Sequence, residues 1–205
     1  MEPMLVIGTG NRKKGAELAG LLAPAGWTLR TLADFLNPIE PGETAETFAG
    51  NAAIKASAQA VHLGTWVLAD DSGLCVDALD GGPGVHSARF AGEPCDNDAN
   101  NSLLLERLAG LSPERRGAQF VCTMALADPT GSIRAESAGI VCGRIRYQLD
   151  GAGGFGYDPL FEIIEYHETF GVLPAAVKAI LSHRAAAARQ MLPHLQRLRL
   201  DAGNS

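Results

Sequence analysis

The chain has 205 residues, of which 46% are hydrophobic and 20% are charged, and its formal net charge is −6. This length and composition predict a single globular domain over residues 1–205 with a substantial core. The negative charge argues against a nucleic-acid polymer as partner. No apolar stretch has the length of a membrane-spanning helix, and the first residues lack the pattern of a secretory signal. We therefore expect no membrane partner and a cytoplasmic location.

The cysteines argue against a zinc site, whereas the few lysines are candidates for phosphate contacts. Cys75, Cys95, Cys122 and Cys142 show no CxxC spacing, so zinc is not expected, and the three in strand-like runs are predicted to be reduced core residues. Arginine is the common cation, whereas the only lysines are Lys13, Lys14, Lys55 and Lys178. These lysines are either places that need a compact ammonium, as at a phosphate, or a product of chance.

An apolar run at residues 4–7 predicts a strand, followed by a glycine-rich turn and an amphipathic helix that ends near Pro24. Free N–H groups and the positive end of a helix meet in such a turn and form an anion site. The dinucleotide fingerprint fails because Lys13 replaces a required glycine. A Walker A loop fails because Gly15 follows Lys14. We predict a phosphate-binding turn of another kind, although many similar turns bind nothing.

A second strand is expected at residues 27–32 and a helix at 44–63. In this helix Thr47, Asn51 and Lys55 recur every four residues and form one polar row. A solvated helix face is the ordinary explanation for such a row. The presence of Asn and Lys on a helix made mostly of alanine favours a functional role for the row.

Two adjacent carboxylates, Asp70 and Asp71, follow the apolar run at residues 66–69. Ser72 and Gly73 are expected to break this strand, and a second short strand should lead to Asp77. Because side chains alternate along a strand, the two carboxylates should point to opposite faces. They could hold Mg²⁺ or activate a water, but Asp, Ser and Gly are also ordinary turn residues, and this stretch alone leaves both readings open.

The rest of the chain predicts short elements and one unusual loop. We expect a tight loop with an extended piece at 81–92, a helix at 96–108, strands at 118–127 and 132–142 joined by a hairpin, a helix at 174–181 and a last helix after Arg184. The glycine-dense loop at 151–159 carries Phe155 and Tyr157, which could stack on a flat ligand. His183, taken alone, would be a cap or surface residue.

Several short motifs occur together in one order along the chain. They are Thr9-Gly10-Asn11 with Lys14, Glu43-Thr44 with Thr47-Phe48, Asn51-Ala52, Lys55-Ala56, Ala69-Asp70-Asp71-Ser72-Gly73-Leu74, Pro83-Gly84, Ser87-Ala88-Arg89, Gly154-Phe155-Gly156-Tyr157-Asp158-Pro159, and Lys178 with Ser182-His183-Arg184. In this order they resemble the inosine triphosphate pyrophosphatase family of non-canonical purine nucleoside triphosphatases. The resemblance implies an α/β fold with a long mixed central sheet flanked by helices, two lobes around a substrate cleft, and a homodimer.

The resemblance also implies an activity and roles for individual residues. The activity is Mg²⁺-dependent hydrolysis of ITP, dITP and XTP to the monophosphate and pyrophosphate, which cleanses the nucleotide pool. Asp71 would be the general base, and Glu43 and Asp71 would bind the metal. Substrate would be bound by Thr9, Gly10, Asn11, Arg12, Lys13, Lys14, Ser72, Phe155, Gly156, Tyr157, Asp158, Lys178, His183 and Arg184.

The chain departs from the family pattern at a few positions. Lys13 replaces a common glycine, and Gly42, Gly50 and Val172 each replace a common glutamate. The sequence also bears on two other function classes. A regulatory module that senses a triphosphate without cleaving it would not need the carboxylates Glu43 and Asp71. A dinucleotide oxidoreductase is disfavoured by the failed fingerprint.

Overall fold

The computed structural model describes residues 4–203, which divide into two compact units. Unit 1 comprises residues 4–71, 122–139 and 184–203, and unit 2 comprises residues 72–121 and 140–183. The single domain predicted from the sequence stays a prediction. The chain passes between the units four times. Two of these passages, between Asp71 and Ser72 and between His183 and Arg184, separate adjacent residues that were predicted to belong to the site.

The helices are α1 (Arg12–Leu22), α2 (Phe48–Leu63), α3 (Asn97–Arg107), α4 (Ala175–Leu181) and α5 (His183–Gly203). The strands are β1 (Met4–Ile7), β2 (Thr28–Thr31), β3 (Trp66–Val76), β4 (Gly117–Ala127), β5 (Ile133–Ile145), β6 (Phe161–Ile163) and β7 (Glu168–Thr169). Short 3₁₀ turns occupy Ala23–Ala25, Leu32–Asp34, Asp77–Leu79, Gly84–Arg89 and Pro113–Arg115. None of the helices among the described residues has both the length and the apolar character needed to cross a membrane.

Within residues 4–203, seven strands form one sheet in the order β2-β1-β3-β4-β5-β6-β7. β1 pairs in parallel with both β2 and β3, whereas β6 pairs antiparallel with β5 and β7. The sheet is therefore mixed and is flanked by helices, as the sequence predicted. The cleft between two lobes stays a prediction.

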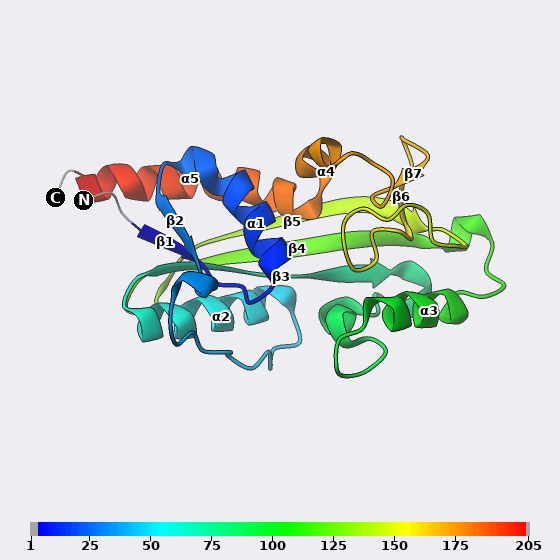
Figure 1. The fold of residues 1–205 in the computed structure, drawn as a ribbon, viewed down its shortest axis with the longest axis horizontal. Helices are drawn as coiled ribbons and strands as arrows, with labels where there is room; N and C mark the ends of the chain where they lie inside the picture. The colour runs from blue at the N-terminus through cyan, green and yellow to red at the C-terminus, as the bar shows by residue number, and fades with distance from the viewer. Residues whose placement is uncertain (1–3, 204–205) are drawn as a thin grey trace. The chain divides into compact units, whose positions relative to one another are not determined.

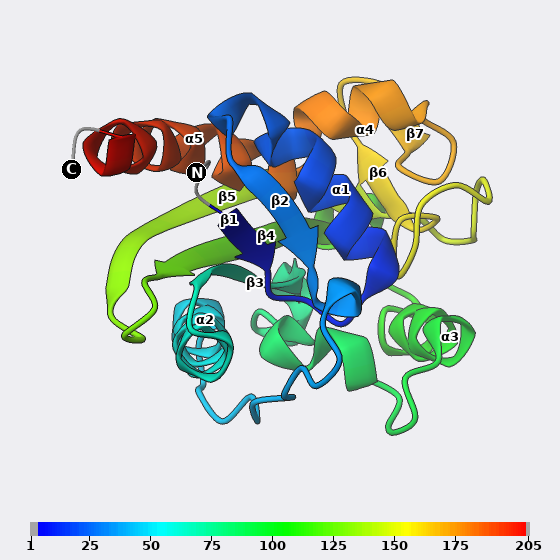
Figure 2. The same cartoon turned by 60° about the vertical axis from the view of Figure 1, so that its left-hand side comes forward.

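Unit 1 is layered, with helices on both faces of its strands (Figures 1 and 2). Alternation along β1 sends Leu5 and Ile7 into a core with α1 and α5, and sends Val6 into a second core with α2. Fully buried alanines on α2 recur every four residues and form a close-packing seam; they are Ala52, Ala56 and Ala60. This seam lets α2 lie close against β3.

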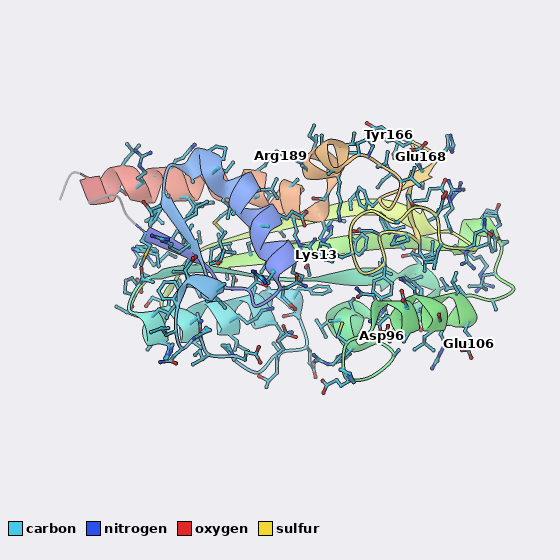
Figure 3. The ribbon with its side chains drawn as sticks, in the orientation of Figure 1. Lys13, Asp96, Glu106, Tyr166, Glu168 and Arg189 are labelled. Carbon is cyan, nitrogen blue, oxygen red and sulfur yellow. The ribbon has the colours of Figure 1, made fainter. Side chains whose placement is uncertain are left out.

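Unit 2 has its own core, built from the far part of β3, helix α3 and strand β6. Leu74, Leu104 and Phe161 are all fully buried in it. Helix α3 begins where the side chain of Asp96 accepts hydrogen bonds from the backbone N–H groups of Asp98 and Ala99, at 2.9 and 3.1 Å. Figure 3 labels Asp96 and Glu106 near the two ends of this helix.

Several predicted boundaries were wrong. Ser72 and Gly73 do not break a strand, because β3 continues through them to Val76 as an interior strand of the sheet. Strand pairing here overrides the local turn preference of Ser and Gly. The extended piece expected within 81–92 is instead the 3₁₀ turn at Gly84–Arg89, and the short strands β6 and β7 were not predicted.

The second helix also differs from the prediction. It starts at Phe48 rather than Thr44, because Thr47 caps it by accepting a hydrogen bond from Gly50 N. Residues before the cap therefore form a loop that carries Glu43.

The cysteine prediction was partly wrong. All four cysteines are free thiols, but only Cys122 is buried, whereas Cys142 is exposed on β5. Alternation along the strand places Cys142 on its outer side.

Candidate active site

The turn between β1 and α1 approaches β3 closely. Gly8 N donates to Leu68 O at 2.7 Å, and a Cβ at Gly8 would come within 2.8 Å of Val67 Cγ1, so this position has no room for a side chain. Further along the turn, Asn11 N donates to the hydroxyl of Thr9, and Gly10 is exposed. The turn is thus anchored at its start by the sheet and shaped at its end by local hydrogen bonds.

Helix α1 begins after Asn11, which is its cap. Asn11 Oδ1 accepts hydrogen bonds from the backbone N–H groups of Lys13 and Lys14 at 3.0 and 3.1 Å. These two amides are satisfied within the turn, so they are not the free anion donors that we predicted. The positive end of the helix and the side chains of Arg12, Lys13 and Lys14 would attract an anion here, and phosphate binding by this turn stays a prediction. Figure 3 labels the exposed Lys13 at the start of α1.

The two adjacent carboxylates of β3 do point to opposite faces. Asp71 Oδ1 lies 2.9 Å from Lys55 Nζ, and Asp71 Oδ2 accepts from Asn51 Nδ2 at 3.3 Å. Asp70 Oδ2 lies 3.9 Å from Lys14 Nζ and 3.8 Å from Arg184 Nε. Strand alternation therefore gives each carboxylate a separate set of partners, as predicted.

Lys55 joins two carboxylates that come from different segments of unit 1. Its Nζ lies 2.9 Å from Glu43 Oε1 and 2.9 Å from Asp71 Oδ1. One turn earlier on α2, Asn51 Oδ1 accepts from Ala45 N at 2.9 Å and so fixes the loop that holds Glu43. The predicted polar row of α2 thus organises Glu43 and Asp71, which we call the carboxylate pair.

The electrostatics of this group follow from burial and pairing. Burial raises the pKa of Asp71 above its usual value, and Lys55 opposes that shift only in part. Burial would lower the pKa of Lys55, but the Asp71 charge and its neighbours outweigh burial and raise that pKa instead. Lys55 therefore stays charged at neutral pH, and Asp71 is more basic than an ordinary aspartate.

The carboxylate pair is of the type that would hold the magnesium ion implied by the family resemblance. Its oxygens are hard donors, and they already converge on one cation, the Lys55 ammonium. Nowhere in residues 4–203 do three or more His, Cys, Asp or Glu side chains gather where they could hold a metal. Mg²⁺ usually takes only one or two protein carboxylates and fills its shell with water and phosphate oxygens, so two are enough.

Gly50, where the family resemblance implies a glutamate, lies at a position with little room for a side chain. A Cβ at this position would lie 2.5 Å from Ala45 Cβ and 3.1 Å from Thr47 Oγ1. A larger residue would displace the loop that leads from Glu43 to α2. The glycine is thus matched to the close approach of this loop to the first turn of the helix.

In unit 2, the loop at residues 154–158 is held by Asp158. Its Oδ2 accepts from Phe155 N at 2.7 Å and pairs with the ammonium of Lys178 on α4. The Lys178 ammonium also lies 4.7 Å from the centre of the Phe155 ring. Gly154 has a φ of 74°, and a Cβ there would overlap Asp158. Asp158, Lys178 and Phe155, all predicted to bind substrate, are therefore in contact with one another.

Two other predicted residues of unit 2 are more deeply buried than expected. Tyr157 is only 5% exposed, its ring lies in the core, and its hydroxyl donates to Ser87 O at 2.8 Å. This leaves Phe155, which is half-buried, as the aromatic side chain that could stack on a ligand. His183 is also buried, and its ring stacks on Phe120 with centroids 4.8 Å apart. It is not the surface residue that its local sequence suggested.

The last predicted residues are Ser72, Gly156 and Arg184. Ser72 is half-buried in β3, and Gly156 O accepts from Asn101 Nδ2 at 3.1 Å. Arg184, in the first turn of α5, donates from Nη1 to Glu17 Oε2 at 3.2 Å. No role was predicted for Glu17, because in the sequence it is only one polar residue of an amphipathic helix. For Asn51 and Lys55 the four-residue spacing indicated a functional row, but it did not predict that their partners are Glu43, Ala45 and Asp71.

Comparison with known proteins identifies the family. The family model described as the Ham1 family matches residues 5–194. The chain belongs to the Ham1 family. This confirms the family that the ordered motifs indicated.

Relatives of this Ham1-family chain include two named as dITP/XTP pyrophosphatases. The one from Rhodopirellula baltica is 53% identical over 95% of this chain and 93% of its own length. The one from Desulforamulus reducens is 47% identical over 95% and 96%. Among solved structures, the Staphylococcus aureus Ham1 protein matches with a TM-score of 0.84 at 33% identity, covering 95% of this chain and 99% of that one. A Mycobacterium abscessus nucleoside-triphosphatase matches with a TM-score of 0.75 at 41% identity, covering 93% and 99%.

Proposed function

We propose that this Ham1-family protein hydrolyses dITP and XTP to the nucleoside monophosphate and pyrophosphate. Relatives named as dITP/XTP pyrophosphatases align over nearly the whole chain, at up to 53% identity among those described above. The observation that carries the proposal is the carboxylate pair organised around Lys55, with a basic turn in the same unit. A module that only senses a triphosphate would need the basic turn and not the two carboxylates.

Hydrolysis of the triphosphate needs a group that accepts the proton of water and cations that stabilise the leaving pyrophosphate. Release of pyrophosphate requires cleavage of the anhydride bridge between the α and β phosphorus atoms. The family resemblance implies that water attacks the α phosphorus, so that the bond from this phosphorus to the bridging oxygen breaks and pyrophosphate leaves. Asp71 would accept the proton of that water, and its raised pKa suits it to this task. Lys14, Lys13 and Arg12 would place positive charge where the leaving pyrophosphate gains negative charge.

We also propose that the reaction depends on Mg²⁺. Glu43 and Asp71 would hold the ion, since their oxygens converge and are of the type that Mg²⁺ prefers. A bound magnesium ion would neutralise phosphate charge and lower the pKa of a coordinated water. In the same arrangement Lys55 keeps both carboxylates close together before substrate arrives.

The proposal extends to ITP as a substrate. ITP carries the same hypoxanthine base as dITP and differs only at the 2′ position of the sugar, so we propose it as a third substrate.

We also propose that the protein is a homodimer. Large apolar side chains exposed in unit 2 support this, namely Ile140, Tyr147, Leu149, Ile164, Tyr166, Val172 and Ile180. Light scattering after gel filtration would measure twice the mass of one chain. The cytoplasmic location stays a prediction.

The decisive experiment identifies the products. The protein is incubated with dITP, XTP, ITP and ATP, with Mg²⁺ or with a chelator, and the products are separated by ion-exchange chromatography. We expect monophosphate and pyrophosphate from the first three, none when the chelator is present, and far less when Asp71→Asn replaces the wild type. Diphosphate plus phosphate would identify a different hydrolase. Tight binding without turnover would support the sensor.

A further inference from the structure

Asp70 is a fully buried carboxylate placed between two cations of unit 1. Its side chain has no exposed surface, and its Oδ2 lies 3.9 Å from Lys14 Nζ and 3.8 Å from Arg184 Nε. A buried charge is costly unless opposite charges compensate it. The two cations reach Asp70 from different elements, α1 and α5, so this one carboxylate holds both of them near β3.

A second acid completes the group and balances its charge. Glu17 lies three residues after Lys14 on the same face of α1, and its Oε2 accepts from Arg184 Nη1 at 3.2 Å. All members of this group influence the pKa of the Cys122 thiol on β4. Burial is the main cause of its raised pKa, but Asp70, Arg184, Lys14 and Glu17 all act on it. These four charges therefore all lie close enough to the Cys122 thiol to act on it.

The tether on Lys14 is electrostatic and leaves its donors available. A separation of 3.9 Å is too long for a hydrogen bond, but it is within the range of an ion pair. Among residues 4–203, the Lys14 ammonium makes no hydrogen bond, and about a fifth of its side chain is exposed. Asp70 thus fixes where this positive charge lies without using the N–H groups that a phosphate would accept from.

The position of Asp70 also separates it from the proposed metal site. The carboxylate pair of Glu43 and Asp71 meets at Lys55, on the α2 side of β3. Asp70 points to the other face, toward α1 and α5. Two adjacent aspartates therefore have different partners and are suited to different tasks.

We propose that Asp70 is a positioning residue that holds Lys14 and Arg184 in place for the substrate and does not bind the metal. The proposal rests on the proposed pyrophosphatase function, because that function supplies the triphosphate that Lys14 would contact. Its benefit is preorganisation. A lysine side chain that is already ordered loses less conformational entropy when a phosphate binds.

The test compares Asp70→Asn with the wild type in two measurements. The first is calorimetric binding of inorganic pyrophosphate to protein without Mg²⁺. The second is the steady-state kinetics of dITP hydrolysis at several Mg²⁺ concentrations. We expect pyrophosphate to bind about tenfold more weakly, the cost of roughly one charge-assisted hydrogen bond. KM for dITP should rise by a similar factor, while kcat and the Mg²⁺ concentration for half-maximal rate change less than threefold.

Two controls sharpen the result. Glu162→Gln removes another buried carboxylate that pairs with arginine, but in unit 2, and it should leave pyrophosphate binding unchanged. Each single variant, Asp70→Asn or Lys14→Ala, lowers the affinity for pyrophosphate by some factor. The double variant should lose less affinity than the product of these two factors, because both changes disable the same ammonium. Fully multiplicative losses would contradict the proposal.

Other outcomes would overturn it. If Asp70 only adds negative charge near the phosphates, Asp70→Asn will bind pyrophosphate more tightly. If Asp70 is a metal ligand, the variant will need much more Mg²⁺ for half-maximal rate. A wild type that hydrolyses no nucleoside triphosphate would refute the proposed function, yet pyrophosphate binding would still decide the role of Asp70.

A measurement on the wild type keeps the test valid if Asp70→Asn does not fold. The chain has only four lysines, so selective ¹³C and ¹⁵N labelling gives four side-chain signals in NMR spectra. Lys55 is tied by two carboxylates at 2.9 Å and serves as the ordered reference. We expect Lys14 to be nearly as ordered as Lys55 without any ligand. A Lys14 side chain that reorients freely on the nanosecond timescale would contradict the proposal.

Discussion

The ammonium of Lys55 lies 2.9 Å from Oδ1 of Asp71, and both side chains are largely shielded from solvent. This pair connects α2 with β3 and places a permanent positive charge beside the proposed general base. The same ammonium reaches Glu43, so one lysine organises both carboxylates of the proposed site.

We predict that Asp71→Asn lowers kcat for dITP by about 10²–10⁴-fold, the usual cost of losing a general base. The fold should persist, because Asn has the same shape and its carbonyl oxygen can still accept a hydrogen bond from Lys55. Steady-state kinetics and circular dichroism measure the two effects. Activity within a few-fold of the wild type would show that another group accepts the proton.

We predict that Lys55→Gln lowers both stability and kcat. Removing the ammonium leaves Asp71 buried with a weaker partner, which costs up to about 3 kcal/mol of unfolding free energy. Denaturant unfolding measures this loss. In the matched double variant with Asp71→Asn, neither charge remains, so the combined loss should be smaller than the sum of the two single losses. Additive losses would mean that the pair is not coupled.

We predict that the two aromatic residues of the glycine-dense loop differ in role. Phe155→Ala should raise KM for dITP by roughly tenfold, because base–aromatic stacking is worth about 1–3 kcal/mol. Tyr157→Phe should leave KM nearly unchanged and lower stability by about 1 kcal/mol, since it loses only the hydrogen bond to Ser87 O. The reverse pattern would identify Tyr157 as the residue that stacks on the base.

We predict that Glu162 stabilises the protein in a pH-dependent way. The hydrogen bonds from Arg144, at 2.7 and 2.8 Å, lower the pKa of Glu162 below its usual value of 4.5. A carboxyl with a lowered folded pKa contributes stability above the unfolded pKa, and that contribution is lost as pH falls through the folded pKa. The difference in unfolding free energy between wild type and Glu162→Gln should therefore be largest at neutral pH and shrink below about pH 4.5.

Glu168→Gln is the control for this measurement, because Glu168 is an exposed residue of the neighbouring strand β7. It should show little difference from the wild type at any pH. A Glu162→Gln effect that is constant from pH 7 to pH 3 would mean that the carboxylate charge is not the source of the stability.

We predict a preference for purines with a 6-keto group, with ATP hydrolysed up to roughly 10⁴-fold less efficiently than ITP. His183 and Arg184 carry N–H donors that a 6-keto oxygen can accept from, whereas the 6-amino group of adenine is itself a donor. His183→Ala and Arg184→Ala are each compared with wild type by kcat/KM for both nucleotides. If replacing a residue lowers kcat/KM for ITP and for ATP by the same factor, that residue does not discriminate between the two bases.

The sequence alone determined features that depend on local periodicity. The four-residue spacing of Asn51 and Lys55 placed them on one face of α2, because a helix repeats every 3.6 residues. The two-residue repeat of a strand placed Asp70 and Asp71 on opposite faces, and both placements are confirmed. The order of short motifs also identified the family, since it depends on residue identity and not on folding.

Only the tertiary structure decided which partners these residues meet. Glu17 and Arg184 are 167 positions apart, and no local pattern predicts their hydrogen bond. The stacking of His183 on Phe120 buries a histidine that its own neighbours in sequence present as a surface residue. Ser72 and Gly73 remain in β3, although their local preference is for a turn, because β3 is an interior strand of the sheet. In each case the deciding energy comes from long-range pairing and burial, which a reading of neighbouring residues does not contain.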